Sequence, residues 1–362
     1  MVTEKPFGYR ANNPMSLRAI VHLPPTAGSR LNQLVNEPRR KAMGRKAAGD
    51  SRAAGLPLAS IYYVVVHTMG NASITTKFTY LHWQDLYKEE KVFLHLTNDT
   101  ISEHDGRKTN TAFHQGLDET VHDVREAQPA GHEFTLDGHG FMYCKSSSQL
   151  ERQQFFDKSM VEQVHFHELE AAARKYMDGV DEIIFYNWRL RNSDIQSDNL
   201  KPANYEDPTA QLGYANTVHI DHSPNSIAER VYRVSPDRAE YLLKGRVRMI
   251  TFWHPINGPV QEWPLAVSDG RTVPVSRLIE CQRIRPTSRG NTVYVLFGEE
   301  TMWYYMSAQD NEDVVLFKSY DSDIQKTCYS AHSAFRIGSS TQTSKSRESI
   351  EVRAFVFTHS KD

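Results

Sequence analysis

The sequence has few cysteines, no long hydrophobic run and almost no net charge, and each absence excludes a class of protein. Its three cysteines, Cys144, Cys281 and Cys328, are too widely spaced for a disulfide framework or a cysteine zinc site. No apolar run reaches the roughly 18 residues that a membrane span requires. A formal net charge of -2 provides no basic field to hold nucleic acid. We therefore expect a cytoplasmic globular protein with no membrane span and no nucleic-acid partner.

Several signature motifs are also missing. The sequence contains no glycine pattern of the Rossmann or P-loop type and no Gly-x-Ser-x-Gly elbow of an esterase. Its first residues, "MVTEKPFGYR", lack the basic-then-apolar order of a secretory signal. Residues 1–60 are rich in Arg, Lys, Ala and Gly without a strong amphipathic period. We interpret them as an N-terminal arm that is partly mobile or forms a lid or dimer surface, so a homodimer is compatible with the sequence.

From residue 61 onward the pattern is that of short strands. β-Branched and aromatic runs are separated by Gly, Asn and Asp, as in "VRMITFWHPI", "DVVLFKSYD" and "SIEVRAFVF". The clearest helix is expected over residues 159–179, with Ser159 and Glu162 as a capping box and Gly179 at its end. This order predicts a mainly β protein with flanking helices (class α+β) and a jelly-roll core, mostly after residue 180. Residues 61–362 are expected to form one catalytic domain.

The segment "TVHID" contains the first candidate metal ligands. In a strand, alternate side chains point to the same face, so His219 and Asp221 would share one face and Val218 and Ile220 the other. Burial of unpaired polar groups costs free energy, so an imidazole and a carboxylate buried together suggest a function such as metal binding. The segment alone is equally compatible with a polar surface strand or with a simple His–Asp hydrogen bond.

Later segments supply the groups that would complete an iron site. Two histidines and one carboxylate with open coordination positions are typical of non-haem Fe(II) oxygenases, and His332 in "SAHSAFRI" could be the second histidine. In "SRESIEVRAFVF", Arg347, Ser349 and Arg353 share one parity and hence one face of a strand. Arginine suits bidentate binding of a carboxylate, here that of a 2-oxo-acid cosubstrate.

At this point the sequence resembles a known family. It is similar to fungal and bacterial Fe(II)/2-oxoglutarate-dependent oxygenases that include gibberellin desaturase, asperfuranone-type hydroxylases, cephem methoxylation enzymes and the endoperoxide-forming enzyme of meroterpenoid biosynthesis. The resemblance spans roughly residues 120 to 358. It rests on "VHDVR", "LDGHGF", "VHIDHS", "ITFWHPINGPV", "WYYM", "FKSYDSD", "HSAF" and "RESIEVRAFVF".

The resemblance implies a double-stranded β-helix with Fe(II) on His219, Asp221 and His332. It also implies that 2-oxoglutarate is anchored by an arginine of the last strand. We favour Arg347 with Ser349 for the distal carboxylate, and Arg353 as a helper or alternate.

Two departures from the family pattern concern the substrate pocket. The family usually carries Asn at Thr251 and Arg at His254, and an acidic-His pair where this chain has Asn187 and Trp188. We therefore expect a specialised pocket whose candidate lining residues are Trp253, His254, Asn187 and Trp188.

The predicted function is oxidation of a small apolar natural product with Fe(II), 2-oxoglutarate and O2. Hydrogen abstraction by a ferryl oxygen would lead to hydroxylation, desaturation or endoperoxide formation in fungal polyketide, terpenoid or meroterpenoid biosynthesis. Two alternatives stay open at this point. One is a jelly-roll scaffold protein that has lost its chemistry, and the other is a metal dioxygenase that does not use 2-oxoglutarate.

Overall fold

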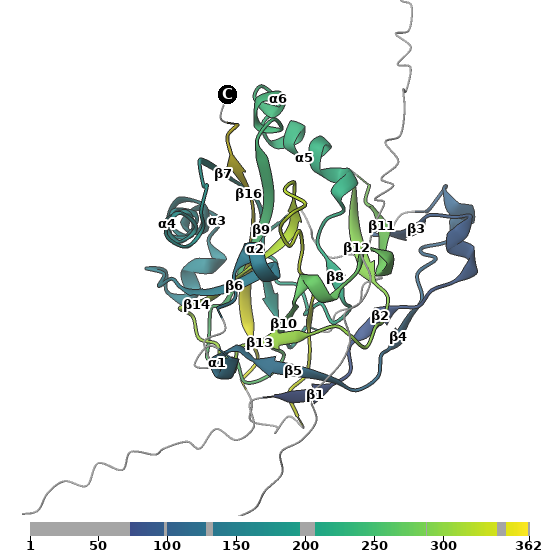
Figure 1. The fold of residues 1–362 in the computed structure, drawn as a ribbon, viewed down its shortest axis with the longest axis horizontal. Coiled ribbons are helices and arrows are strands. Elements are labelled where there is room, and N and C mark those ends of the chain that lie inside the picture. Colours follow the sequence, from purple (N-terminus) through teal and green to yellow (C-terminus); the bar gives the residue numbers. More distant parts are fainter. Residues whose placement is uncertain are drawn as a thin grey trace, which may run out of the picture. The chain divides into compact units, whose positions relative to one another are not determined.

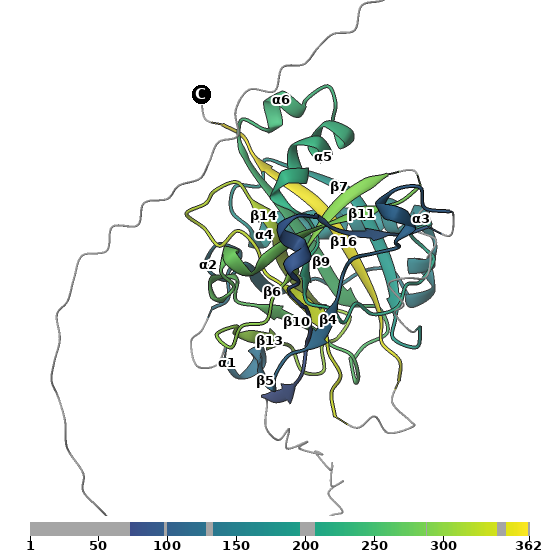
Figure 2. The same cartoon turned by 90° about the vertical axis from the view of Figure 1, so that its right-hand side faces the viewer.

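The structure is a computed structural model that describes residues 73–97, 100–127, 133–195, 207–286, 288–338 and 345–360. These residues belong to one unit, which runs from Val66 to Asp362. The N-terminal arm predicted over residues 1–60 lies outside the described residues. Figure 1 and Figure 2 show the unit from two directions.

Two β-sheets form the body of the molecule. Among the described residues, one sheet has nine strands, in spatial order β1 (Ile74–Thr76), β5 (Glu119–Asp123), β13 (Trp303–Tyr305), β10 (Leu265–Ser268), β15 (His332–Ala334), β8 (His219–Ile220), β12 (Arg289–Val295), β11 (Leu278–Ile284) and β3 (Val92–His95). The other has five, in the order β6 (Phe141–Lys145), β14 (Asp313–Asp321), β9 (Arg246–Pro255), β16 (Glu348–Thr358) and β7 (Glu182–Asn192). A separate ribbon pairs β2 (Thr79–Leu81) with β4 (Phe113–Gln115).

Short helical segments connect and cover the strands. The α-helices are α1 (Val124–Ala127), α2 (Leu136–His139), α3 (Lys158–Met160), α4 (Phe166–Tyr176), α5 (Ile227–Val234) and α6 (Ala239–Leu242). The 3-10 turns are η1 (Asp85–Lys88), η2 (His104–Gly106), η4 (Arg152–Phe156), η6 (Pro224–Ser226), η7 (Gly270–Thr272) and η8 (Val275–Arg277). The predicted mainly β fold with flanking helices and a jelly-roll core is confirmed.

The two sheets face one another across a shared core. Trp253 and Phe317 of the five-stranded sheet belong to the same buried cluster as Val267 and Tyr304 of the nine-stranded sheet. The ring of Phe317 also lies 4.4 Å, centroid to centroid, from that of His332 on the opposite sheet. The space between the sheets is therefore the interior of the jelly roll, and side chains that point into it can meet from both sheets.

Side chains alternate along β16, so the two faces of the five-stranded sheet carry different sets of its residues. Ile350, Val352 and Ala354 pack into a cluster with Leu169 and Ala173 of α4, which covers the outer face. The residues of opposite parity, Ser349, Glu351 and Arg353, must point to the inner face because strand side chains alternate.

The helix predicted over residues 159–179 is present, but its start and end differ from the prediction. Asp157, not Ser159, caps it, because the Asp157 side chain accepts hydrogen bonds from the backbone N–H groups of Ser159 and Met160. A π-helical turn, η5 (Val161–His165), joins α3 to α4, and the helix ends at Tyr176. Gly179 follows with a φ of 63°, in the left-handed region that favours glycine.

Helices α5 and α6 lie at one end of the sheets in both views (Figures 1 and 2). Ile227 and Val231 of α5 pack with Leu242 of α6 against Phe355 and Phe357 of β16. This apolar contact anchors α5 directly after the segment that carries His219 and Asp221.

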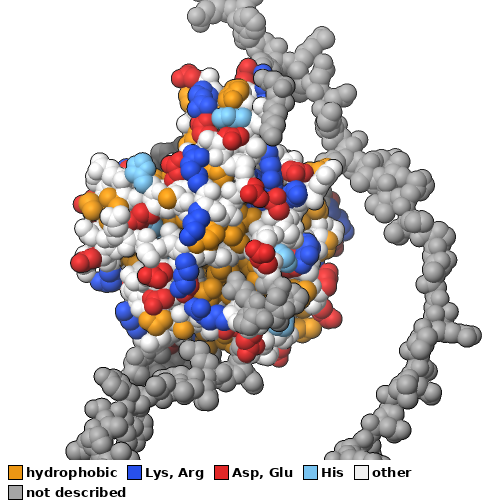
Figure 3. Space-filling view, turned by 60° about the vertical axis from the view of Figure 1, so that its left-hand side comes forward, with side chains coloured by type: hydrophobic (Ala, Val, Ile, Leu, Met, Phe, Trp, Pro, Cys, Tyr) orange, Lys and Arg blue, Asp and Glu red, His pale blue; other side chains and the backbone are white. Residues whose placement is uncertain are grey.

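No helix among the described residues is long and apolar enough to cross a membrane. On the face shown in Figure 3, acidic and basic side chains are interspersed. This mixture on one face agrees with the small net charge of the sequence.

A buried charge network holds the end of β14 to β9 and α2. The Lys318 ammonium donates to Asp321 and, over 2.8 Å, to Asp137, and the Arg246 guanidinium donates to both carboxylates. Lys318 and Asp321 are buried. Burial alone would raise the pKa of Asp321, yet Arg246 and Lys318 lower it below the ordinary value.

We expect this network to make the protein sensitive to acid. A carboxylate whose folded pKa lies below its unfolded value of about 3.9 stabilises the fold above that value and loses the contribution as pH falls further. Asp321→Asn should lower the free energy of unfolding by about 3–5 kcal/mol at neutral pH and flatten its decline below about pH 4. Urea unfolding at a series of pH values measures both effects. The exposed Asp237→Asn is the control, and an equal loss in that variant would contradict the prediction.

Candidate metal centre

His219, Asp221 and His332 meet in the interior of the jelly roll. His219 begins β8 and His332 begins β15, and these neighbouring strands pair with the two histidines directly opposite one another. Asp221 follows β8 and has the same parity as His219. One ligand atom from each residue lies within 4.8 Å of the others, the only such group of three found among the described residues.

The distances and hydrogen bonds suit a shared metal ion. Asp221 Oδ1 lies 3.8 Å from His219 Nε2 and 3.9 Å from His332 Nε2, too far for hydrogen bonds. Two ligand atoms, each about 2.1 Å from an ion, can be at most about 4.2 Å apart. His219 Nδ1 lies 2.8 Å from the carbonyl oxygen of Thr217, and His332 Nδ1 lies 3.4 Å from that of Ser330. Because a carbonyl only accepts, each Nδ1 carries the proton and each Nε2 is free to bind metal.

The protonation states also favour metal binding. Burial, with the neighbouring His332, lowers the pKa of His219 to about 3, and burial lowers the pKa of His332 as well. Burial opposes ionisation of Asp221, but the Arg353 guanidinium beside it holds the pKa of that carboxyl well below its usual range. At neutral pH the site therefore offers two neutral imidazoles and one carboxylate, the forms that coordinate a metal.

Arg353 and Thr251 orient the Asp221 carboxylate. Arg353 donates from Nε to Asp221 Oδ2 over 2.9 Å and from Nη2 to Oδ1 over 2.8 Å, and the Thr251 hydroxyl donates to Oδ2 over 3.1 Å. Arg353 also donates to Glu351 and Asn187. Since an ionised carboxylate has about four lone-pair sites, Oδ1 can still coordinate an ion.

Arg347 and Ser349, by contrast, have polar atoms with no partner. Both side chains are buried, and neither Arg347 Nε nor Ser349 Oγ has a hydrogen-bond partner among the described residues. Arg347 Nη1 donates to the carbonyl oxygen of Trp263 over 2.7 Å, and its guanidinium lies 5.4 Å from the centre of the Trp253 ring. Two unsatisfied donors two residues apart in the sequence, one of them on a cation, are groups that a carboxylate ligand could satisfy.

The charge on Arg347 is uncompensated. No carboxylate forms an ion pair with it in the described part of the chain, and burial, with Arg191 nearby, lowers the pKa of Arg347 to about 9. A buried cation of this kind favours the arrival of an anion. Arg353 differs, because its guanidinium is engaged by Asp221 and Glu351.

The four predicted pocket residues divide between the two faces of the sheet. Asn187 and Trp253 are on the inner face, where they contact Arg353 and Arg347. Trp188 and His254 are on the outer face, on the opposite side of the sheet from the candidate metal ligands. His254 Nε2 lies 3.1 Å from His165 Nε2, and Trp188 packs in the cluster beneath α4. The reason is the strand period of two, which sends sequence neighbours to opposite faces.

Replacing Trp188 tests whether this residue contributes to the stability of the fold or to activity. Trp188→Ala removes a buried indole and should lower the free energy of unfolding by about 3–5 kcal/mol. Metal-dependent activity of the folded fraction should be unchanged, as measured after correction for unfolded protein. Asn187→Ala, one residue away on the inner face, is the matched comparison and should lower activity with the smaller effect on stability. A specific loss of activity in Trp188→Ala would contradict the assignment of faces.

Sequence reasoning missed several contributors to the site. Glu351 bridges Arg353 and Arg191, accepting from each over 2.9 Å. Its parity, shared with Ser349 and Arg353, was a signal that could have revealed it. Tyr186 had no such signal. Arg353 pairs with Asn187 and Ala354 with Phe185, so Tyr186 is the extra residue of a β-bulge. Its hydroxyl lies 2.8 Å from His222 Nε2.

Comparison with known proteins identifies relatives of this site and fold. The family model described as "Oxidoreductase/YMDC permease-like domain" matches residues 78–357. The Fe(II)/2-oxoglutarate-dependent dioxygenase nvfI of Aspergillus novofumigatus is 32% identical over 245 residues, which are 66% of this chain and 84% of the relative. The hydroxylase/desaturase efuI of Hormonema carpetanum is 29% identical over 252 residues, 66% of this chain and 82% of the relative.

A solved structure agrees with these sequence matches. The structure of the iron and alpha-ketoglutarate-dependent endoperoxidase NvfI superposes with a TM-score of 0.67 at 25% identity. The match covers 80% of this chain and 99% of that chain.

Proposed function

Because this chain belongs to the Fe(II)/2-oxoglutarate-dependent dioxygenases, we propose that it oxidises a small natural product at an iron held by His219, Asp221 and His332. The observation that carries the proposal is the buried group of two neutral imidazoles and one carboxylate. Its relatives include a hydroxylase/desaturase and an endoperoxidase. The proposed reaction is accordingly hydroxylation, desaturation or endoperoxide formation, in the biosynthesis of a polyketide, terpenoid or meroterpenoid.

In this proposal the protein residues position the metal, and the metal supplies the oxidising power. When bound, Fe(II) would use O2 and 2-oxoglutarate, which becomes succinate and carbon dioxide, to remove hydrogen from a substrate carbon. The carbonyl oxygens of Thr217 and Ser330 keep both histidine Nε2 atoms free of protons. Arg353 and Thr251 hold the Asp221 carboxylate in one orientation, as outer partners of metal ligands commonly do.

Arg347 and Ser349 are proposed to bind the distal carboxylate of 2-oxoglutarate. Arg347 Nε and Ser349 Oγ would each donate one hydrogen bond, satisfying two atoms that have no partner among the described residues. The Trp253 ring beneath the guanidinium and the Trp263 carbonyl fix its orientation before the ligand arrives. Trp253 and Asn187, on the inner face, are proposed to border the substrate.

The alternatives raised by the sequence receive less support from the same residues. A catalytically inactive scaffold protein would not require an intact group of metal ligands in which a histidine Nδ1 is held by a backbone carbonyl oxygen. A metal dioxygenase without 2-oxoglutarate would leave the buried Arg347 cation uncompensated.

The proposal is tested by reconstitution with Fe(II) in the absence of oxygen. One Fe(II) per chain should bind, and addition of 2-oxoglutarate and O2 should yield succinate. O2 consumption should require 2-oxoglutarate. A protein that takes up no iron would be a scaffold, and O2 consumption without 2-oxoglutarate would indicate the other class of dioxygenase.

Two further features belong to the proposal. We propose that the enzyme works in the cytoplasm, since Cys144, Cys281 and Cys328 are all free thiols, as is usual in a reducing compartment. A homodimer stays a prediction, and the molecular mass in solution, measured by light scattering, tests it.

A further inference from the structure

Two arginines near the metal centre have no polar partner. Arg230 of α5 and Arg283 of β11 are half-buried, and in the described part of the chain neither makes a hydrogen bond or an ion pair. Their Nε atoms are fully shielded from solvent. Arg248, by comparison, also has a shielded Nε without a partner in the described residues, but its terminal nitrogens donate to the carbonyl oxygens of Asp178 and Gly179. Among the described residues, Arg230 and Arg283 lack contacts of this kind.

Arg230 and Arg283 are both neighbours of Gly290. Arg283 pairs directly with Gly290 across the β11–β12 hairpin, so a side chain at position 290 would share a face with Arg283. A Cβ atom there would lie 3.5 Å from Arg230 Nη2 and would meet no other atom within 4 Å. The glycine therefore leaves open space next to Arg230 Nη2, on the face of the hairpin that carries Arg283.

Arg230 is linked to the metal ligands through Tyr186 and His222. The Arg230 guanidinium lies 5.5 Å from the centre of the Tyr186 ring, whose hydroxyl pairs with His222. His222 directly follows the ligand Asp221, and its Nδ1 is another buried atom without a partner in the described residues. Arg230 and His222, each with a shielded nitrogen that has no partner in the described residues, therefore both contact Tyr186, and His222 is one residue from the ligand Asp221.

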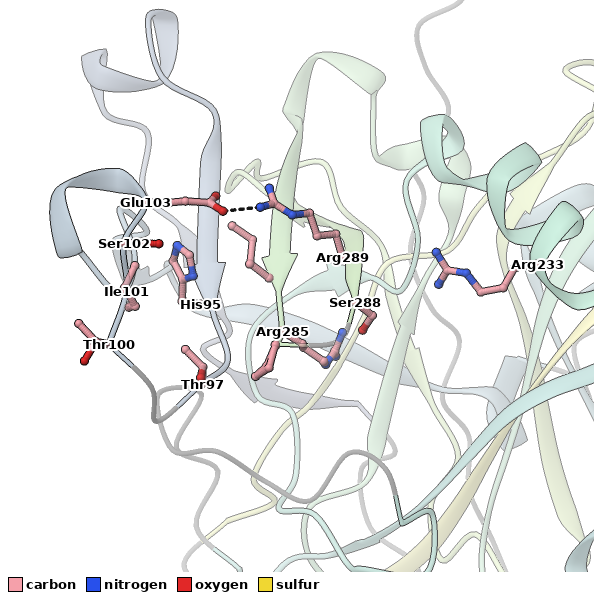
Figure 4. A pocket seen from close by; sticks show the side chains of 12 residues that line it. His95, Thr97, Thr100, Ile101, Ser102, Glu103, Arg233, Arg285, Ser288 and Arg289 are labelled. Carbon is pink, nitrogen blue, oxygen red and sulfur yellow. Dashed lines mark hydrogen bonds and ion pairs between the residues drawn. The ribbon is translucent and has the colours of Figure 1, made fainter. Parts of the chain in front are cut away.

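Neighbouring arginines of the same helix and hairpin are neutralised. A hollow of about 570 Å³ opens on the other side of these elements and is lined by Arg233, Arg289 and Glu103 among others. Figure 4 shows Arg289 and Glu103 pointing toward one another, with their side chains 2.5 Å apart. Arg233 pairs with Glu229. Arg233 and Arg289 therefore have acidic partners, whereas Arg230 and Arg283 have none among the described residues.

We propose that Arg230 and Arg283 bind a carboxylate of the substrate. The inference rests on the proposed function and narrows its substrate class to organic acids that reach from this pair to the metal. A carboxylate offers two acceptors in one plane, which match the N–H groups of guanidinium. Its arrival compensates two charges and satisfies shielded donors, so the free energy lost by leaving them unpaired is recovered on binding. The predicted substrate is accordingly less apolar than the sequence suggested.

The test measures binding without turnover. The protein is loaded with Zn(II), which is redox-inert, and saturated with 2-oxoglutarate, so that the Arg347 site is filled. Calorimetric titration then compares 4-phenylbutanoate and dodecanoate with their methyl esters. The two carboxylates should bind, and the esters should bind at least about 10-fold more weakly, since they lack the charge. Arg230→Leu and Arg283→Leu should each weaken carboxylate binding by about 10-fold or more, with partial recovery in Arg230→Lys.

Controls separate this inference from folding effects and from the proposed function. Arg233→Leu, on the exposed side of α5, should bind the carboxylates like the wild-type protein. Thermal unfolding shows whether each variant is folded. Binding of neither carboxylate, equal binding of acids and esters, or displacement of the acids by additional 2-oxoglutarate would overturn the inference. Succinate formation by the wild-type enzyme is measured separately, so its absence refutes the proposed function and not merely the substrate class.

Discussion

Replacing His332 with alanine is expected to abolish iron-dependent succinate formation, because it removes one of three ligands that hold the metal. Loss of an outer partner of a metal ligand typically costs 10- to 100-fold in affinity, so loss of a ligand should weaken Fe(II) binding by more than about 100-fold. Anaerobic titration with Co(II), followed by its visible absorption, measures metal affinity independently of turnover. The exposed His167→Ala is the matched control and should bind metal normally. Normal metal affinity in His332→Ala would contradict the assignment.

Asp221→Ala should also abolish iron-dependent succinate formation. Its free energy of unfolding, however, should differ from that of His332→Ala. Without Asp221, the buried Arg353 loses two of its hydrogen bonds and a counter-charge. Removal of one partner of a buried ion pair typically costs about 3–5 kcal/mol of unfolding free energy. The metal-free Asp221→Ala protein should therefore be less stable than metal-free His332→Ala, as measured by urea unfolding. Equal stability would show that the Arg353–Asp221 pair contributes little to the fold.

Replacing Arg347 with leucine is expected to raise the KM for 2-oxoglutarate by about 100-fold or more. Loss of one partner of a buried, hydrogen-bonded charge pair typically costs about 2–5 kcal/mol of binding free energy, and tenfold in affinity corresponds to about 1.4 kcal/mol. Iron affinity in the absence of 2-oxoglutarate should be unchanged. Ser349→Ala, which removes one neutral donor, should have the smaller effect, about 1–2 kcal/mol. Initial rates of succinate formation at varied 2-oxoglutarate concentrations give the KM of both variants.

The ligand-free Arg347→Leu protein should be as stable as the wild type or more stable. Its guanidinium is buried without a carboxylate partner among the described residues, so removing it relieves a desolvation cost. Arg347→Lys retains the charge but not the planar pair of donors, and should recover only part of the affinity. An unchanged KM in Arg347→Leu would instead direct attention to Arg353 as the anchor of the cosubstrate.

Local sequence determined which residues can act together on one face of a strand. The two-residue period relates His219 to Asp221 and Arg347 to Ser349 and Arg353, and the resemblance joined these segments into one iron and 2-oxoglutarate site. The structure brings the three ligands within 4.8 Å of one another. The same period places Asn187 and Trp188 on opposite faces of the sheet, and likewise Trp253 and His254, since neighbours in a strand cannot both face inward.

Tertiary structure alone decided which face is inward and what each cation contacts. Nothing in the sequence marks Arg353 as the partner of Asp221 and Arg347 as unpaired, because that depends on how β16 meets β8 across the interior. The bulge at Tyr186 and the position of Arg230 beside Gly290 likewise depend on contacts between distant segments. Local periodicity is set by backbone geometry within a few residues. The pairing of charges is set by which strands and helices pack together, and packing forms only when the whole chain folds.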